Sequence, residues 1–463
     1  MGVQVDVEPV TRYRAINSAQ LRQTPYWSKL SRELQDAVEV VSTVLPFRTN
    51  EYVLANLIDW NAIPDDPIFR LVFPHRDMLA PAQYKSLRDH LNAGNRARLQ
   101  DAVMAIRTEM NPHPAGQMSH NVPIVDGHRL TGVQHKYRET VLFFPSAGQT
   151  CHAYCAFCFR WPQFVGTAVG RFGARDVDAL ERYLHANKDV TDVLFTGGDP
   201  MIMNAASLRQ YLRPLLSPHL ERIQSIRIGT KSISYWPQRF VTDEDADDIL
   251  RLFDDVTRRG RHLALMAHIS HPREIDTTLS RRAIERVRAT GAIVRTQSPI
   301  VKNVNDDPGT WEELWNTSVR LGIVPYYMFV ERDTGPRKYF EVTLHRAYEV
   351  FRQAYSRVSG LARTVRGPLM SAFPGKILID GIAQIGAEQV FALQLIQGRQ
   401  SEWVRRPFYA KFDMEATWFD DLHPAFGEER FFFGRQDPQG FLTDDQSSPS
   451  GDIDIESAVS TFA

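Results

Sequence analysis

Residues 151–160 read CHAYCAFCFR, and this run holds all three cysteines of the 463-residue chain, Cys151, Cys155 and Cys158. Thiolates are soft ligands that suit iron–sulfur clusters. Three of them on one short loop can bind three irons of a [4Fe–4S] cube and leave the fourth iron open. An open iron can bind a small molecule and pass it an electron. The run therefore predicts a redox metal centre with these three cysteines as its ligands.

A zinc site and a disulfide framework each account for the cysteines less well. Structural zinc usually takes four protein ligands, and His152, inside the loop, does not complete a common zinc spacing. A disulfide framework is disfavoured because the number of cysteines is odd and the chain is long. The Cys-x3-Cys-x2-Cys spacing closely resembles the signature of the radical S-adenosylmethionine (SAM) enzymes, which hold such a cluster.

The overall composition argues against several classes of partner. Lys and Arg number 54 and Asp and Glu number 55, so no basic surplus predicts binding to nucleic acid or to an anionic membrane. The sequence contains no run of about eighteen apolar residues, so no membrane span is predicted. The first residues, MGVQVD, lack an apolar signal core. Because a reducing compartment suits an oxygen-sensitive cluster, we expect a cytoplasmic protein.

The pattern of the chain changes at about residue 126. Residues 1–125 are expected to be mainly helical, because apolar residues recur at helical spacing within 28–44 and 97–110. Residues 126–340 alternate short apolar runs with helical stretches, which predicts a parallel sheet with right-handed crossovers. The predicted strands are 140–144, 192–196, 225–230, 263–269, 293–299 and 325–330.

Six strand–helix units are too few to close an eight-stranded barrel, so we predict an α/β fold built on an open, partial (β/α)6 barrel. The cysteine loop follows the first strand, where such sheets bind ligands. Residues 341–435 are expected to form a C-terminal extension that starts with a long helix. Residues 436–463, rich in Ser, Asp and Gly, are predicted to be disordered.

A second motif, Gly197-Gly198-Asp199-Pro200, follows the second predicted strand. Glycine lets the backbone approach a ligand closely, and a carboxylate or a carbonyl can bind an ammonium group. An isolated Gly-Gly-Asp would be read as an ordinary turn. Here the motif ends the strand that follows a cysteine loop, which predicts that Gly197, Gly198 and Asp199 bind a ligand. In radical SAM enzymes the ligand at this place is the methionyl amino group of SAM.

With these motifs, residues 50–395 resemble the lysine 2,3-aminomutase family of radical SAM enzymes. Five further blocks match in order: RIGTK at 227–231, PQR at 237–239, HISHPREI at 268–275, QSPIVKNVND at 297–306 and PYYMFV at 325–330. The resemblance implies an isomerase that moves the amino group of a free amino acid between carbons 2 and 3. It also implies a [4Fe–4S] cluster, SAM and pyridoxal 5′-phosphate (PLP), with an electron donor such as flavodoxin or ferredoxin.

The resemblance also implies roles for single residues. Lys376, after a Pro-Gly turn, corresponds to the lysine that holds PLP. Lys136 and Tyr137 match a pair near PLP, and Lys136 can contact the phosphate as a point charge, while Thr140 lies near the place of an unmatched arginine. Arg160 matches the arginine that binds the substrate carboxylate. Further SAM contacts are expected from three residues on later strands, Arg227, His268 and Gln297.

The sequence departs from the family where lysine would be recognised. Lysine aminomutases bind the distal ammonium with two acidic residues, and the first falls here on Arg332, followed by Asp333. The second falls on a segment without an acid. Since a buried ammonium needs a partner, we expect Arg332 to face an acidic or neutral side chain, as in glutamate. Asp333 would restore lysine binding if the alignment shifted by one residue.

Three alternatives remain from the sequence. In the first, the chain is a radical SAM enzyme that has lost PLP and does another reaction, such as epimerisation or dehydrogenation. A missing absorbance band of a PLP imine, together with no effect of Lys376→Ala, would favour it. In the second, the chain modifies a lysine on a partner protein, which a more open entrance to the site would favour. In the third, it is a non-catalytic iron–sulfur protein, which failure to cleave SAM would favour. The family's zinc-binding C-terminal cysteines are missing, so a homo-oligomer would need other contacts.

Overall fold

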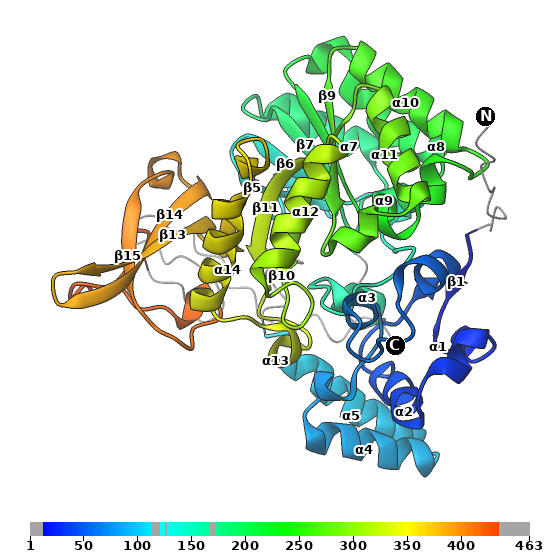
Figure 1. Cartoon of the computed structure of the whole chain (residues 1–463). Helices are drawn as coiled ribbons and strands as arrows, with labels where there is room; N and C mark the ends of the chain where they lie inside the picture. The colour runs from blue at the N-terminus through cyan, green and yellow to red at the C-terminus, as the bar shows by residue number, and fades with distance from the viewer. Residues whose placement is uncertain (1–12, 113–120, 126, 167–171, 435–463) are drawn as a thin grey trace, which may run out of the picture.

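Eleven strands form one mixed sheet in the order β15-β14-β13-β12-β11-β10-β9-β8-β7-β6-β5 (Figure 1). The computed structural model describes residues 13–112, 121–125, 127–166 and 172–434. Strands β6 to β11 are neighbours in chain order and run parallel, which confirms an α/β fold with a large sheet. The predicted disordered tail, residues 436–463, lies outside the described residues.

The six parallel strands begin and end within one residue of their predicted positions. They are β6 Thr140–Phe143, β7 Asp192–Phe195, β8 Ser225–Thr230, β9 His262–His268, β10 Ile293–Ile300 and β11 Val324–Val330. Helices connect or follow them: α7 Val177–Ala186, α8 Ala205–Leu212, α10 Ala246–Arg258, α11 Thr278–Ala289, α12 Pro308–Arg320 and α14 Leu344–Arg357. This alternation follows from short apolar strands separated by amphipathic segments.

Residues of each strand alternate between two faces of the sheet. On β8, Ile226 and Ile228 are fully buried in the core formed with the covering helices. Arg227 and Gly229 point to the opposite face, called the inner face here, and are less buried. The carboxyl ends of the parallel strands meet at one edge, so the loops that follow them come together.

The N-terminal region consists mainly of α2 Arg32–Val41, the π-helix Val53–Leu57, α3 Pro67–Val72, α4 Pro81–Asn92 and α5 Arg96–Glu109. It packs against the loop after β6, because Ala153, Phe157 and Trp161 belong to its hydrophobic core. Buried Asp66 caps α3 by accepting from the Phe69 amide at 2.8 Å and also forms an ion pair with Arg273, which follows β9. The helical region is therefore fastened to the carboxyl edge of the sheet.

Four strands extend the sheet beyond β11: β12 Arg366–Ser371, β13 Gly375–Ile385, β14 Glu388–Gly398 and β15 Pro407–Lys411. β12 is parallel to β11, and β13 to β15 are antiparallel to their neighbours and project away from the parallel strands (Figure 1). These strands and β5 Val133–Tyr137 were not predicted. None of the helices in the described ranges is long and apolar enough to cross a membrane.

Candidate active site at the cysteine loop

The three cysteines lie on the loop between β6 and the short helix Trp161–Phe164, and none forms a disulfide. Burial raises the pKa of Cys155 to about 12 and of Cys158 to about 11, and each thiol lies in the electrostatic field of another. A buried thiolate needs nearby positive charge, which a bound metal supplies. The donor set therefore fits an iron–sulfur cluster.

Within the described ranges, no three His, Cys, Asp or Glu side chains converge closely enough to bind a single metal ion. A mononuclear site requires such convergence. A four-iron cluster binds each cysteine at a different iron, so its ligands stand further apart. The ligands of such a cluster therefore do not need to converge on one point.

The N-terminal region holds the first half of this loop directly. Arg48 Nη1 donates to Thr150 Oγ1 at 2.7 Å and to the carbonyl of Cys151 at 3.0 Å, and its guanidinium lies 5.0 Å from the Tyr154 ring centre. The Tyr154 amide donates to the Arg48 carbonyl at 2.8 Å. Sequence reasoning missed Arg48, because its partners lie about a hundred residues away and no local pattern marks it.

Arg48→Ala should loosen this loop. Hydrogen bonds from a charged donor contribute about 1.5–3 kcal/mol, so we expect the amides of Tyr154 and Ala156 to exchange with solvent roughly tenfold faster or more. Hydrogen exchange followed by mass spectrometry measures this. Arg32→Ala is the matched control, because Arg32 is 89% exposed. Unchanged exchange in Arg48→Ala would contradict a role in holding the loop.

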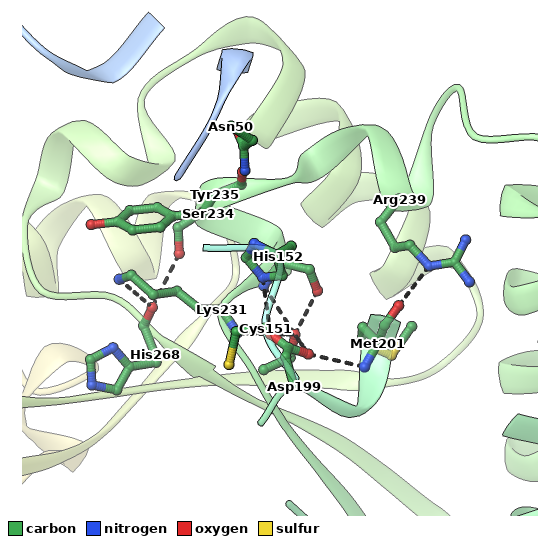
Figure 2. Close-up of polar contacts among 12 residues, drawn as sticks. Asn50, Cys151, His152, Asp199, Met201, Lys231, Ser234, Tyr235, Arg239 and His268 are labelled. Carbon is green, nitrogen blue, oxygen red and sulfur yellow. Dashed lines mark hydrogen bonds and ion pairs between the residues drawn. The ribbon is translucent and has the colours of Figure 1, made fainter. Parts of the chain in front are cut away.

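Asp199 joins the cysteine loop to the next two strands (Figure 2). Its buried carboxylate accepts from the Met201 amide at 2.9 Å, from Thr230 Oγ1 at 2.8 Å and from the Lys231 amide at 2.8 Å. His152 Nε2, inside the cysteine loop, lies 3.1 Å away. The side chain is therefore committed to protein partners, and any contact of this motif with a ligand falls to its backbone.

The two glycines before Asp199 are required by the packing of two loops. A Cβ on Gly197 would overlap the side chain of Gln149, and one on Gly198 would overlap the backbone of Thr150. Gly197 also has φ of +137°, a conformation that favours glycine. At both glycines the close neighbour is therefore the segment that leads into the cysteine loop, whereas the sequence predicted a ligand there.

His268 and Gln297 lie side by side at the carboxyl edge, since they are register partners on β9 and β10. The His268 ring stacks on Phe157 of the cysteine loop with 5.6 Å between ring centres. Burial, with the charge of Lys231, lowers the pKa of His268 well below its usual value, and its buried Nδ1 has no partner. This neutral imidazole is a free polar group beside the cysteines.

Lys231 has a different environment from that of a ligand-binding lysine. Its Nζ donates to Glu274 Oε2 at 2.5 Å. Nζ also donates to the His268 carbonyl at 3.2 Å and lies 4.1 Å from the Tyr235 ring centre (Figure 2). Arg227, predicted to contact SAM, forms an ion pair with Asp192, the first residue of β7. It sits in the first half of β8, towards the edge opposite the cysteine loop.

Two guanidinium groups face the inner side of the cysteine loop. Arg160 and Arg332 lie 5.1 Å and 5.2 Å from the Phe159 ring centre, and Arg160 also lies 4.4 Å from that of Phe144. Burial lowers the pKa of Arg160 to about 10, and the buried Nε of Arg332 has no hydrogen-bond partner. Two partly buried guanidiniums with unused donors can bind a carboxylate. Asp333 follows Arg332 in the loop after β11.

Glu331 is a site residue that the sequence reasoning passed over. It is the first residue after β11, 8% exposed, and close enough to raise the pKa values of Cys155 and Cys158. Burial raises the pKa of Glu331 well above its usual value, and Arg332 partly offsets this. Its position at the carboxyl end of a parallel strand was the signal that could have identified it.

The three residues assigned to PLP come together at the junction of β5 and β13. Lys376 Nζ donates to Gln397 Oε1 at 2.5 Å and lies 5.4 Å from the ring centre of Tyr137 and 5.0 Å from that of Tyr327. Lys136 Nζ donates to the carbonyl of Ala372. The buried hydroxyl of Tyr137 lies beside the Ser371 side chain, and no hydrogen bond of normal geometry joins them.

Lys376 is set up as a nucleophile near neutral pH. Burial, reinforced by Arg227 and Arg366, lowers its pKa from 10.5 to about 7. Only the neutral amine attacks an aldehyde, so the rate of covalent attachment of PLP should rise with pH up to about 7 and level off above about 8. Stopped-flow absorbance at a series of pH values tests this. A rate that keeps rising to pH 10 would indicate an ordinary lysine and contradict the expectation.

No family model matches the chain. A putative L-lysine 2,3-aminomutase of Aquifex aeolicus is 30% identical over 394 residues, covering 85% of this chain and 92% of that protein. The L-lysine 2,3-aminomutase of Escherichia coli is 28% identical over 53% of this chain and 69% of its own length. That of Haemophilus influenzae is 29% identical over 51% and 68%.

Solved structures overlap this chain only in part. Streptococcus suis SuiB bound to its precursor peptide SuiA gives a TM-score of 0.33 at 13% identity, covering 55% of this chain and 49% of that chain. A radical SAM methyltransferase from Sphaerobacter thermophilus gives 0.33 at 18% identity, covering 52% and 68%. Overlap at this TM-score does not define a shared fold.

Proposed function

The chain belongs to the lysine 2,3-aminomutase family of radical SAM enzymes, and we propose that it moves the amino group of a free amino acid between carbons 2 and 3. The parallel strands and their helices are the partial (β/α)6 barrel of this proposal, and β12 to β15 are the extension that carries the PLP lysine. One observation carries the proposal. Arg160 and Arg332 lie 5.1 Å and 5.2 Å from the ring centre of Phe159, which belongs to the cysteine loop. Lys136 and Lys376 each lie 5.4 Å from the ring centre of Tyr137, and the charge of Arg332 acts on Lys136.

Cys151, Cys155 and Cys158 would hold a [4Fe–4S] cluster, and the backbone around Asp199 with neutral His268 would meet SAM. Lys376 would hold PLP, with Tyr137 beside it. When bound, the cluster and SAM supply a radical that removes hydrogen from an unactivated carbon, and PLP supplies a conjugated ring that supports migration of nitrogen. The protein's own part is to orient these groups and to keep water out. Fully buried Phe144, which contacts Arg160, and Phe172, which packs on Phe144, favour this exclusion of water.

The substrate carboxylate would be bound by Arg160, which is partly buried and has unused N–H donors. Arg332 would meet the substrate side chain, which favours an acidic or neutral amino acid such as glutamate. The unused Nε of Arg332 supports this choice, since a buried guanidinium is stabilised by an anion. Glu331 favours a second candidate, a basic side chain such as that of lysine, because a buried carboxyl can pair with an ammonium.

The test is anaerobic reconstitution with iron, sulfide and PLP, followed by reduction with SAM and a mixture of amino acids that includes glutamate and lysine. We expect 5′-deoxyadenosine and one new β-amino acid, both followed by mass spectrometry. A β-isomer of glutamate or of lysine decides between the two candidates. Deoxyadenosine without any isomer would contradict the aminomutase proposal and favour a protein substrate or another reaction.

A further inference from the structure

A second group of cations lies on the inner face, towards the edge opposite the cysteine loop. The Arg366 guanidinium is 4.7 Å from the ring centre of Tyr326 and 4.5 Å from that of Tyr327. Arg295 is 5.3 Å from the ring centre of Tyr326. These four residues, from β10, β11 and β12, are called the floor cluster here. Aromatic faces hold both guanidiniums in place while leaving their N–H groups available.

The floor cluster has more positive charge than its surroundings balance. The nearby carboxylate of Asp192 is taken by Arg227, whose Nε lies 2.8 Å from Oδ1, and Thr140 Oγ1 donates to its Oδ2 at 2.9 Å. Among the described residues, neither Arg295 nor Arg366 lies within ion-pairing distance of a carboxylate. Two guanidiniums without a counter-ion in a partly buried position form a site for a dianion.

Lys376 connects this cluster to the rest of the site. Its Nζ and the guanidinium of Arg366 lie 5.0 Å and 4.5 Å from the same ring centre, that of Tyr327. On its other side, Lys376 shares the ring of Tyr137 with Lys136, each Nζ lying 5.4 Å from the ring centre, and the charge of Arg332 acts on Lys136. Lys376 is therefore placed between the cations beside the cysteines and the cations of the floor cluster.

Position decides which anion the floor cluster takes. A substrate that reacts with a radical formed at the cysteine loop must lie between that loop and Lys376. The rest of a cofactor attached to Lys376 must then extend the other way. Lys136, the phosphate contact predicted from sequence, is a poor choice, because its Nζ is engaged by the Ala372 carbonyl and burial lowers its pKa well below the usual value.

We propose that Arg295 and Arg366 bind the phosphate group of PLP on the floor cluster. The inference rests on the proposed function in requiring PLP on Lys376. The same chemistry would also suit the second carboxylate of an acidic substrate. A phosphate monoester carries about two negative charges at neutral pH and accepts several hydrogen bonds, which matches two guanidinium forks.

The experiment compares PLP with pyridoxal, which has the same aldehyde without the phosphate. The full chain is titrated with each, covalent attachment is followed by absorbance, and borohydride reduction with peptide mass spectrometry locates it on Lys376. We expect Arg366→Gln and Arg295→Gln each to weaken PLP binding about tenfold or more and to leave pyridoxal binding within about twofold. Arg366→Lys should retain part of the affinity. Arg363→Gln, on an exposed arginine three residues earlier, should change neither.

Each outcome has a separate meaning. If Arg366→Gln and Arg295→Gln weaken PLP and pyridoxal binding to the same extent, the two arginines support the structure and do not contact the phosphate, which would overturn the inference. Unchanged PLP binding with a weaker response of the PLP-loaded protein to added glutamate would assign the floor cluster to the substrate and also overturn it. If the unmodified chain attaches neither aldehyde at Lys376, the PLP part of the proposed function has failed and the inference fails with it.

Discussion

Cys155→Ala should leave the protein without its iron–sulfur cluster and reduce SAM cleavage to below about one per cent of that of the unmodified protein, because two thiolates cannot hold a cluster that needs three. The charges of Lys231 and Glu331 both act on the Cys155 thiol. Iron content, the visible absorbance of the cluster and anaerobic formation of 5′-deoxyadenosine measure the effect.

The control for this variant is inside the molecule. Covalent attachment of PLP at Lys376 should be unchanged in Cys155→Ala, since that lysine stands on β13 and makes its contacts with β5, β11 and β14. Thermal unfolding should show one transition close to that of the unmodified apoprotein. Retained SAM cleavage in a variant that still binds PLP would contradict the assignment of Cys155 as a cluster ligand.

Lys376→Ala should separate the two halves of the reaction. Without the lysine amine, covalent attachment of PLP and formation of a β-amino acid should both fall below detection. Slow SAM cleavage should continue, because the cysteine loop and Asp199 are untouched. The product and deoxyadenosine are measured in the same reaction. Lys411→Ala is the matched control, since Lys411 is an exposed lysine at the end of β15 in the same sheet.

Persistence of the β-amino acid in Lys376→Ala would show that this lysine does not hold PLP. Loss of SAM cleavage together with product would show instead that the substitution disturbs the cysteine loop. The rescue by an added primary amine, such as methylamine, distinguishes a missing nucleophile from a misfolded site. Partial recovery of PLP-dependent product is expected only if the surrounding pocket is intact.

The parallel part of the sheet was predictable because its strands are short apolar runs that end at polar or glycine residues. β8 follows the prediction at both ends, and Ile226 and Ile228 alternate with inner-face residues as the period of two requires. The C-terminal strands were missed although β13 shows the same alternation, with Ile377 and Ile379 buried. Glycine and proline around them dominated the sequence pattern.

The candidate site was predictable only where a local motif marks a residue. The cysteines and Asp199 stand in such motifs, and Lys376 follows a Pro-Gly turn. Arg48 could not be found, because its role depends on hydrogen bonds to Thr150 and Cys151, about a hundred residues away. Similarly, no pattern in the sequence indicates that Arg227 is taken by Asp192, since that pairing depends on the register of β7 and β8.

In the proposed reaction, a radical formed at the cysteine loop acts on an amino acid held at Lys376. The most direct measurement uses the amino acid identified by the mixture assay, deuterated at carbon 3, with the reconstituted protein and SAM. We expect deuterium in the recovered 5′-deoxyadenosine and in the β-amino acid product. Deuterium-free deoxyadenosine, formed at the same rate with and without the amino acid, would contradict the account.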